Sequence, residues 1–467
     1  MSTLEHLKAL VGFNTVSATK AELDQSNLAM LEHMAAHLKR CCFTTALYEV
    51  QTGKYNLIAL SPAFDKRTLH TSDKLGLLLS GHSDTVPFDN NKWTNDATDL
   101  TVRDGKAYGR GSCDMKAFLA CSMQVIEDMH AKFGNDYAAY PRVCLMATCD
   151  EESSMCGAID LQRLKHTPLT ANNFSKLEVS IPEGLDLSAD DLADAFVNKS
   201  FELIIIGEPT LLQPVVAHKG YIAREICIKG VSTHSSNPSL GINALEFSST
   251  VIQELTAYAN ELSKTNLDSN FLVPYATLNL GYVRGGHSLN SVCDEVVIGF
   301  DMRPMPTHSI AKLNEQTDAL YAKLNDKAQE LFASKLSTPS IRAKIPSANV
   351  NACKSEFVGT AKAQAISATD GDLSGQFISM NIPFADIPSF ANNDEHSLSI
   401  LRRHLPEDVT FDYVNYCTEA SFLQDLGPVV IIGPGSIDQA HGVDEYVALS
   451  ELDRYDTFLS ALVDDFF

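Results

Sequence analysis

Three short apolar runs in this chain each end in acidic or imidazole side chains, and this repeated pattern limits the folds open to it. The runs at residues 77–79, 143–147 and 203–206 lead into Gly81-His82-Ser83-Asp84, Asp150-Glu151-Glu152 and Gly207-Glu208 respectively. Continuous apolar runs bounded by turn-forming residues predict buried strands. Open α/β sheets place their sites beyond the carboxyl ends of such strands, so we expect these polar side chains to converge there.

The rest of the first 210 residues supports an α/β architecture. Residues 2–11 and about 20–40 have helical periodicity, and residues 55–60 have the character of a strand. Helices and strands that alternate in this way predict a layered α/β domain. Because 467 residues exceed what one core usually supports, we expect at least two domains.

Past Glu208 the order of predicted elements changes to strand, helix, strand, strand, helix and strand. This order suggests a ferredoxin-like α+β domain inserted into the main fold. We expect the main domain at residues 1–212 and 391–467, and the inserted domain at residues 213–390. The polar stretch from about 165 to 200 is interpreted as a loop-like surface insertion, and residues 335–383 are assigned to the inserted domain.

Composition excludes several classes of function. The net charge is 36 − 59 = −23 and no block of Lys or Arg stands out, which argues against nucleic acid or an anionic membrane as partner. The N-terminus lacks a secretory signal pattern, and no apolar run is long enough to span a bilayer. The eleven cysteines contain no C-x-x-C pair, which favours reduced thiols over a disulfide framework. We expect a soluble, cytoplasmic protein.

The motif around His82 offers a first pair of candidate site residues. Residues two apart in a strand point to the same side, so His82 can bind a metal while Asp84 holds its ring. Taken alone, a His-x-Asp pair at a strand end is more often a simple hydrogen-bonded pair. Asp114 is predicted in the first turn of a helix that begins near Cys113, where an acid is also common without any metal.

The later candidates complete a set of metal ligands. His441 follows a fourth apolar run at residues 429–432, although a single late histidine is more often structural. The combined set of two imidazoles and three carboxylates suits zinc or a similar cation, and its size suits two ions that share a bridging carboxylate. The set comprises His82, Asp114, Glu152, Glu208 and His441. Glu151 is the candidate general base, because it is the neighbour of the ligand Glu152 in the sequence and its side chain is expected to point away from that of Glu152.

Seven motifs now identify a resemblance. They are GHSDTVP, GRGSCDMKA, DEESSMCGA, IIGEPTLLQPVVAHKGYI, VSTHSSNPSLGINALE, VNYCTEASF and GPGSIDQAHGVDEY. They resemble the dinuclear zinc amidohydrolases, a family that includes succinyl-diaminopimelate desuccinylase and the aminoacylases. Within it, EPTLLQPVVAHKG, VNYCTEA and GPGSIDQAH are similar to the acetylornithine deacetylase group. The resemblance covers about residues 2–165 and 202–467, except for part of 335–383.

The resemblance assigns the ligands to ions. It implies two zinc ions, with cobalt as a substitute. One would be held by His82, Asp114 and Glu208, and the other by Asp114, Glu152 and His441. Asp84 would orient His82 and Glu151 would be the base. All of these positions carry the expected residue type.

The resemblance also implies roles for three residues of the inserted domain. His234 would reach a neighbouring subunit's site and stabilise an oxyanion, or it is an ordinary loop histidine. Asn290 and Arg303 would hold the α-carboxylate of the substrate, although Arg303 has the alternative of a structural ion pair. The family also implies a homodimer formed through the inserted domain.

Two glycines near the C-terminus are further candidates. Gly433 and Gly435 are expected to let the backbone approach the substrate closely, because glycine has no side chain to obstruct it.

The activity that the resemblance implies is metal-dependent hydrolysis of N-acetyl-L-ornithine to L-ornithine and acetate, a step of arginine synthesis. The alternatives are a broader N-acyl-amino-acid amidohydrolase or a dipeptidase of the same family, since selectivity lies in the shape of the pocket. A non-catalytic relative used as a binding module would have lost ligands, whereas none is lost here.

Overall fold

The computed structural model describes residues 1–342 and 377–467 and divides into two compact units. The first unit contains Met1–Ala217, Phe390–Tyr413 and Thr418–Phe467, and the second contains His218–Ser389 and Val414–Cys417. The chain therefore leaves the first unit, forms the second and returns. The short segment Val414–Cys417 belongs to the second unit, although the sequence placed it in the main domain. Most of the stretch 335–383 lies outside the described residues.

A ten-stranded mixed sheet forms the centre of the first unit. Its main path runs β14-β9-β16-β8-β3-β6-β2-β1-β7, and β15 pairs with β9. The strands are β1 (Thr44–Gln51), β2 (Lys54–Leu60), β3 (Leu77–His82), β6 (Val143–Thr148), β7 (Ser175–Ser180), β8 (Leu203–Ile206), β9 (Val215–His218), β14 (Phe390–Ala391), β15 (Asp412–Val414) and β16 (Val429–Ile431). A separate three-stranded sheet contains β4 (Thr101–Arg103), β5 (Lys106–Tyr108) and β17 (Tyr446–Ala448).

The four central strands β16, β8, β3 and β6 are parallel. Every residue of these strands is buried, which fits their continuous apolar sequences. Their register brings the strand ends together, since His82 pairs with Thr148 and Ser80 pairs with Ile206. The prediction that the strands deliver their polar residues to one edge of the sheet is therefore confirmed.

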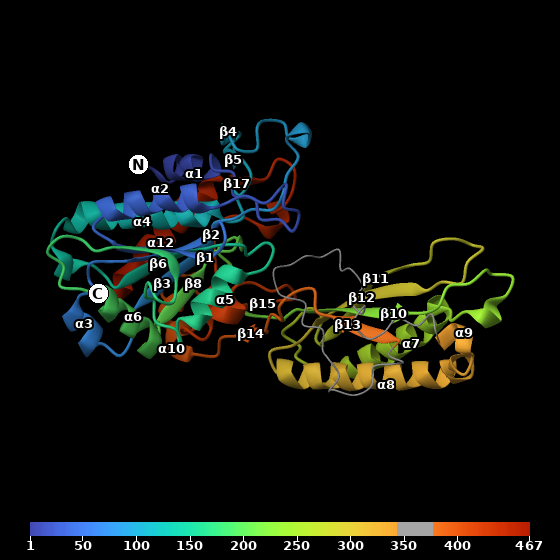
Figure 1. The fold of residues 1–467 in the computed structure, drawn as a ribbon. Coiled ribbons are helices and arrows are strands. Elements are labelled where there is room, and N and C mark those ends of the chain that lie inside the picture. The colour runs from blue at the N-terminus through green and yellow to red at the C-terminus, as the bar shows by residue number, and fades with distance from the viewer. Residues whose placement is uncertain (343–376) are drawn as a thin grey trace. The chain divides into compact units, whose positions relative to one another are not determined.

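Helices cover both faces of this sheet (Figure 1). They are α1 (Thr3–Val11), α2 (Leu28–Arg40), α3 (Lys66–Thr71), α4 (Lys116–Phe133), α5 (Cys156–Arg163), α6 (Ala189–Asn198), α10 (Glu395–Arg402), α11 (Ala420–Leu423) and α12 (Leu449–Val463). Helices α1, α4 and α12 pack together, and α2 and α5 both contact β1 and β2. The apolar faces of α1, α2, α4 and α12 join one core, in which Leu7, Met34 and Phe118 are fully buried.

The expectation of a loop-like insertion at residues 165–200 is wrong. The stretch contains β7, which extends the central sheet by antiparallel pairing with β1, and the helix α6. Ser188 and Asp191 form a capping box at the start of α6, and this local signal was available in the sequence. The surrounding polar residues masked it.

The second unit is an antiparallel sheet with helices on one face (Figure 1). Its elements are β10 (Ile222–Lys229), α7 (Ala244–Leu262), β11 (Thr277–Gly285), β12 (Glu295–Arg303), α8 (Ile310–Leu336), α9 (Pro339–Arg342) and β13 (Ile378–Asn381). The strand order β11-β12-β10-β13, with this order of elements along the chain, gives the predicted ferredoxin-like arrangement.

Two further sequence expectations concern cysteines and membranes. Nine cysteines of the described ranges have free thiols, whereas Cys227 is disulfide-bonded, so the expectation of reduced thiols does not hold for every cysteine. Within the described ranges, no helix combines the length and the apolar composition needed to cross a bilayer.

Candidate metal centre

His82 ends β3 with its ring held in one orientation. Its Nδ1 lies 3.0 Å from the backbone carbonyl oxygen of Asp84, which only accepts hydrogen bonds. The ring therefore donates from Nδ1 and presents Nε2 to the site, where Nε2 lies 2.9 Å from Oδ1 of Asp114. A metal-binding imidazole is fixed in this way by a partner of its other nitrogen. Asp84 thus orients His82 through its main chain, because its carboxylate is 3.7 Å from Nδ1.

Asp114 lies before helix α4 and not in its first turn. The helix begins at Lys116, because residues 111–114 form a turn in which Gly111 has φ of +76°, outside the helical region. The prediction of a helix-start acid is therefore wrong in detail. The turn still brings the Asp114 carboxylate to His82, and the side chain of Asp114 is only 7% exposed.

His441 connects Asp114 to Glu152. Its Nε2 lies 3.3 Å from Oδ2 of Asp114 and 3.1 Å from Oε1 of Glu152. Single ligand atoms of His82, Asp114 and Glu152 all lie within 4.8 Å of one another. Four of the five predicted metal ligands therefore meet at one place, and Asp114 contacts both imidazoles with different oxygens, as a bridging carboxylate would.

Glu208 and Glu151 complete the acidic site. Burial and the charge of Asp114 raise the pKa of Glu208 to about 8. Burial and the charge of Glu208 raise the pKa of Glu151 well above its usual range. Among the described residues, neither carboxylate has a hydrogen-bond or ion-pair partner. Glu208 is thus close enough to Asp114 to be affected by its charge.

The same excess of negative charge acts on Asp84. Burial, together with the carboxylates of Asp150 and Glu152, raises the pKa of Asp84 to about 6, against the opposing charge of His82. In contrast, hydrogen bonds to Asp114 and Glu152 raise the pKa of His441 to about 10.

These residues fit a divalent metal. Carboxylates that crowd in a buried site repel one another unless they take up protons or a cation is bound. The donor set of imidazole nitrogens and carboxylate oxygens is one that zinc and similar cations prefer. The site therefore has the donors, the charge and the ring orientation of a metal centre.

One buried acid near the centre was missed by sequence reasoning. Glu419, the residue before α11, is fully buried and accepts a hydrogen bond of 2.5 Å from Thr148 at the end of β6. Its other oxygen has no partner among the described residues. Burial raises the pKa of Glu419 to about 7. The hydrogen bond from Thr148 and the charge of His82 oppose this shift, whereas the charge of Asp84 adds to it. Its only signal in the sequence was its place in the motif VNYCTEASF.

The predicted residues of the second unit form two local groups. His234 is exposed and its Nδ1 lies 2.7 Å from the hydroxyl of Ser236. The segment of Asn290 runs beside it, because the backbone N–H of Ser235 donates to the carbonyl of Asn290. The structure thus places His234 and Asn290 in adjacent segments of the chain, and their substrate roles stay predictions.

Arg303 forms a separate group in the second unit. Its Nε donates to Asp301 at 3.2 Å, and its guanidinium stacks 4.4 Å from the ring centre of Tyr221. The structural ion pair anticipated as an alternative for this residue is therefore present. A role in binding a carboxylate stays a prediction.

Gly433 and Gly435 have packing reasons of their own. A Cβ at Gly433 would lie 2.3 Å from the carbonyl oxygen of Gly207, in the segment that carries Glu208. Gly435 has φ of +85°, and a Cβ there would lie 2.7 Å from Sγ of Cys113. Gly433 allows neighbouring backbone to approach and Gly435 leaves room for the Cys113 thiol, while the contact of both with substrate stays a prediction.

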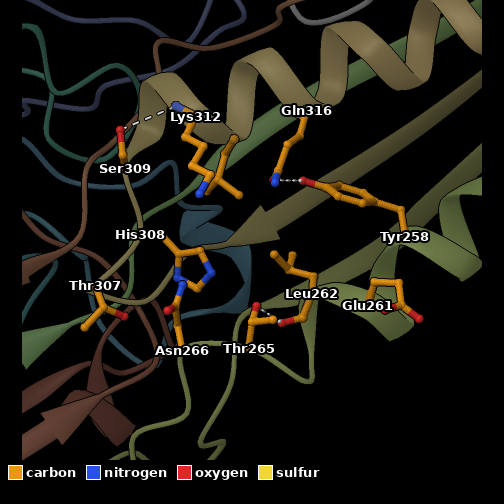
Figure 2. Close-up of a pocket in the computed structure, with 11 residues that line it drawn as sticks. Tyr258, Glu261, Leu262, Thr265, Asn266, Thr307, His308, Ser309, Lys312 and Gln316 are labelled. Carbon is orange, nitrogen blue, oxygen red and sulfur yellow. Dashed lines mark hydrogen bonds between the residues drawn. The ribbon is translucent and has the colours of Figure 1, made fainter.

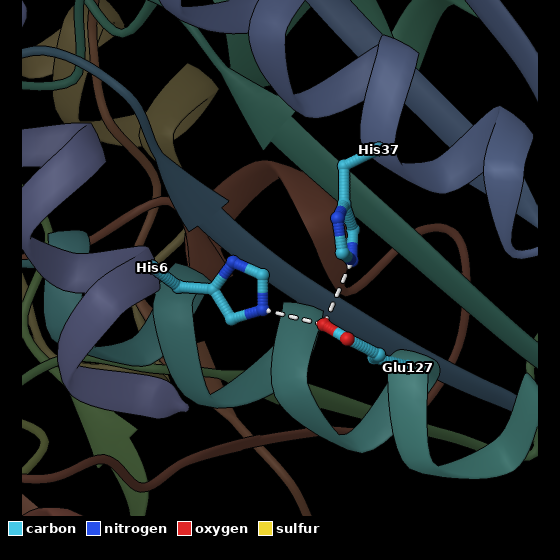
Figure 3. Close-up of side chains that lie close together, drawn as sticks. All are labelled: His6, His37 and Glu127. Atoms are coloured by element: carbon cyan, nitrogen blue, oxygen red, sulfur yellow. Dashed lines mark hydrogen bonds and ion pairs between the residues drawn. The ribbon is translucent and has the colours of Figure 1, made fainter. Parts of the chain in front are cut away.

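A second group of metal-type side chains joins α1, α2 and α4 (Figure 3). Nε2 of His6 and Nε2 of His37 lie 3.1 and 3.7 Å from the same oxygen of Glu127. However, Nδ1 of His37 faces the Arg40 guanidinium at 3.3 Å, which can only donate, so His37 carries its proton on Nε2. Nδ1 of His6 has no partner in the described chain. The group is therefore best explained as a helix-packing contact.

The second unit also contains a cavity of about 500 Å³ (Figure 2). It lies between the C-terminal end of α7 and the N-terminal end of α8, and Tyr258, His308 and Lys312 contribute to its lining. None of the predicted site residues lines it. The predicted metal ligands and Glu151 lie instead at the edge of the central sheet of the first unit.

Comparison with known proteins agrees with this site. The model of peptidase family M20/M25/M40 matches residues 78–465. The chain belongs to this family and is a metal-dependent hydrolase.

Two individual relatives have a name that is more specific than the description of the family. The acetylornithine deacetylase of Proteus mirabilis (strain HI4320) is 31% identical over 465 residues, covering 99% of this chain and 96% of the relative. That of Vibrio vulnificus (strain CMCP6) is 32% identical over 455 residues, covering 97% and 95%. A tripeptidase from Staphylococcus aureus shares the fold at a TM-score of 0.61 and 16% identity, covering 99% and 97% of the two chains. The di-peptidase Dug1p from Saccharomyces cerevisiae has a TM-score of 0.59 at 13% identity, covering 99% and 95%.

Proposed function

We propose that this protein removes the acetyl group from N-acetyl-L-ornithine and releases L-ornithine and acetate in the cytoplasm, as a step of arginine synthesis. The observation that carries the proposal is the convergence of Glu151, two imidazoles and the ligand carboxylates at one edge of the sheet. The full-length relatives named acetylornithine deacetylase support the choice of substrate.

The proposed ligands are divided between two cations, zinc in the first instance and cobalt as a substitute. His82, Asp114 and Glu208 would hold one ion, and Asp114, Glu152 and His441 the other. When bound, two such ions supply electrophilic stabilisation of the amide carbonyl and lower the pKa of water. The position of Asp114 between the two imidazoles supports its assignment as the bridging ligand.

Glu151 is the proposed general base. Glu151 is half-buried beside the ligands and its carboxylate has no partner within the described residues, so it is available to take a proton from the attacking water. The same group would later give this proton to the leaving nitrogen of ornithine. Asp84 would hold Glu151 in place, because the backbone N–H of Glu151 donates to Asp84 at 3.1 Å.

The roles proposed for the second unit depend on its assembly. We propose that it forms the interface of a homodimer and that His234 stabilises the oxyanion in the partner's site, while Asn290 and Arg303 bind the α-carboxylate of the substrate. Sedimentation that shows a monomer under assay conditions would remove the dimer and the role of His234 together.

A substrate panel tests the proposed activity. The protein is purified, its metal content is measured, and it is assayed with N-acetyl-L-ornithine, other N-acetyl amino acids and dipeptides. We expect the highest kcat/KM with N-acetyl-L-ornithine. The fold shared with a tripeptidase and a di-peptidase makes peptides the second candidate, and faster cleavage of dipeptides would replace the proposed substrate.

A further inference from the structure

Glu445 is a buried carboxylate that holds the turn before helix α4. It is 1% exposed. One oxygen accepts hydrogen bonds from the backbone N–H groups of Cys113 at 2.9 Å and Asp114 at 3.0 Å. The other accepts from the backbone N–H of Gly111 at 2.9 Å and from the side chain of Arg110 at 2.8 Å. Four donors thus surround one carboxylate, and one of these donors is the backbone N–H of Asp114, the proposed bridging ligand.

Arg110 extends this contact to the segment of the last metal ligand. Its Nη2 donates to the backbone carbonyl of Gly442 at 3.2 Å and lies 3.5 Å from that of His441. Its guanidinium is covered by the ring of Trp93, 5.0 Å from the ring centre. The ion pair of Arg110 and Glu445 therefore contacts the backbone of both ligand-bearing segments.

The His441 segment needs such support. His441 has φ of +63°, a left-handed conformation that costs energy for a residue with a side chain. Its side chain is 53% exposed, so packing alone does not hold it. The Nε2 of this exposed residue nevertheless lies 3.3 Å from Asp114. A fixed distance between two loops requires a connection between them, and Arg110 with Glu445 provides one.

We infer that Glu445 and Arg110 are positioning residues that hold Asp114 and His441 at the separation needed to bind a divalent cation between them. This inference rests on the proposed metal site. Neither side chain is among the proposed ligands, so both would act through the residues that bind the cation. Partners that orient ligands in this way typically change metal affinity about 10- to 100-fold when they are removed.

A buried ion pair could instead serve folding alone, and the chain offers a matched control for this. In the second unit, Arg224 donates to Asp386 at 2.7 and 3.0 Å, and the side chain of Arg224 is 3% exposed. Asp386→Asn weakens a partly buried ion pair within the unit that contains none of the proposed metal ligands. It measures what the loss of such a pair does to stability without any change at the ligands.

The experiment compares Glu445→Gln, Asp386→Asn and the natural sequence as full chains. Zinc affinity is measured by competition with a chromophoric chelator, and thermal unfolding is followed on the metal-free proteins. We expect Glu445→Gln to bind its weaker zinc ion 10- to 100-fold less tightly at temperatures where it is folded, while Asp386→Asn keeps the natural affinity. Equal zinc affinity for Glu445→Gln and the natural protein would overturn the inference.

Arg110→Lys provides a second variant should Glu445→Gln not fold. Lysine keeps the charge beside Glu445 but lacks the fork that reaches the carbonyls at 441 and 442. We expect a smaller loss of zinc affinity in the same direction, and unchanged affinity would again overturn the inference. A natural protein that binds no zinc would instead refute the proposed metal site, so the two failures are distinguishable.

Discussion

The carboxylate of Asp84 accepts a hydrogen bond from the backbone N–H of Glu151, with 3.1 Å between the two atoms. Its second oxygen accepts from the backbone N–H of Glu152 at 3.2 Å, and its main-chain carbonyl accepts from the ring of His82. Asp84 thus holds the proposed base Glu151 and two proposed ligands. These ligands are His82 at the end of β3 and Glu152 just after the neighbouring strand β6. This relationship makes the proposed site a connected unit, and its parts can be tested separately.

Replacing Glu151 separates the base from the ligands. We expect Glu151→Ala to lower kcat by about 10²–10⁴-fold, because a positioned general base contributes this much to a rate. Metal content should stay at the natural level, since Glu151 is not among the proposed ligands. The measurement is kcat together with metal analysis of the same sample. Loss of metal would show that Glu151 is a ligand and that its role has been exchanged with that of a neighbour.

Replacing Asp84 tests the connection between the two strands. Asp84→Asn can no longer accept hydrogen bonds on both side-chain atoms, so one of the N–H groups of Glu151 and Glu152 loses its partner. We expect zinc affinity to fall about 10- to 100-fold, as for other partners of metal ligands. Asp89→Asn, which changes an exposed loop residue, serves as the control. Equal affinities in both variants would contradict the role given to Asp84.

Replacing Gly111 tests the turn that positions the side chain of Asp114. It has φ of +76°, and an added Cβ would lie 2.7 Å from Cγ2 of Thr85. Gly105 has nearly the same φ, +71°, but nothing lies within 4 Å of its Cβ position. We expect Gly105→Ala to cost about 1 kcal/mol for the backbone alone and Gly111→Ala to cost about 1–3 kcal/mol more for the crowding. Chemical denaturation of the two variants gives the difference, and equal costs would show that the turn adapts.

The His6, His37 and Glu127 group predicts a dependence of stability on pH. Burial lowers the pKa of His37 to about 4 from an ordinary value of 6.5, so the unfolded chain takes up this proton more readily than the folded protein. Its contribution is complete above pH 6.5 and is lost as the pH falls towards 4, by about 3 kcal/mol in all.

The variant His37→Gln isolates this contribution from those of other groups. We expect the free-energy difference between the natural protein and the variant to shrink by about 2 kcal/mol between pH 7 and pH 4.5. Urea denaturation at the two pH values measures it. A difference that stays constant would show that His37 is charged in the folded protein.

Much of the fold was predictable because its signals are local. The apolar runs that became β3, β6 and β8 are uninterrupted, and their polar ends had to lie at one edge once the strands were parallel. The order of elements in the second unit was also sufficient to predict its arrangement. In contrast, β7 was missed because its side chains are mostly polar, and a strand at a sheet edge requires little apolar sequence.

The parts of the site that were missed depend on contacts between distant segments. Glu419 meets Thr148 across 271 positions, and Glu445 meets Asp114 across 331. No periodicity or spacing reveals such pairs in a single sequence. The ligands themselves were found because each follows a recognisable strand or turn, whereas the residues that hold them in place have no signal of that kind.

The most direct test of the account is a zinc titration of the metal-free protein, with release of ornithine from N-acetyl-L-ornithine measured at each point. The account predicts that two zinc ions bind per chain and that the rate reaches its maximum when both are bound. It predicts in addition that Asp114→Ala neither binds the pair nor releases ornithine. Full occupancy by two ions without release of ornithine would contradict the proposed substrate, and full activity without bound metal would contradict the metal centre itself.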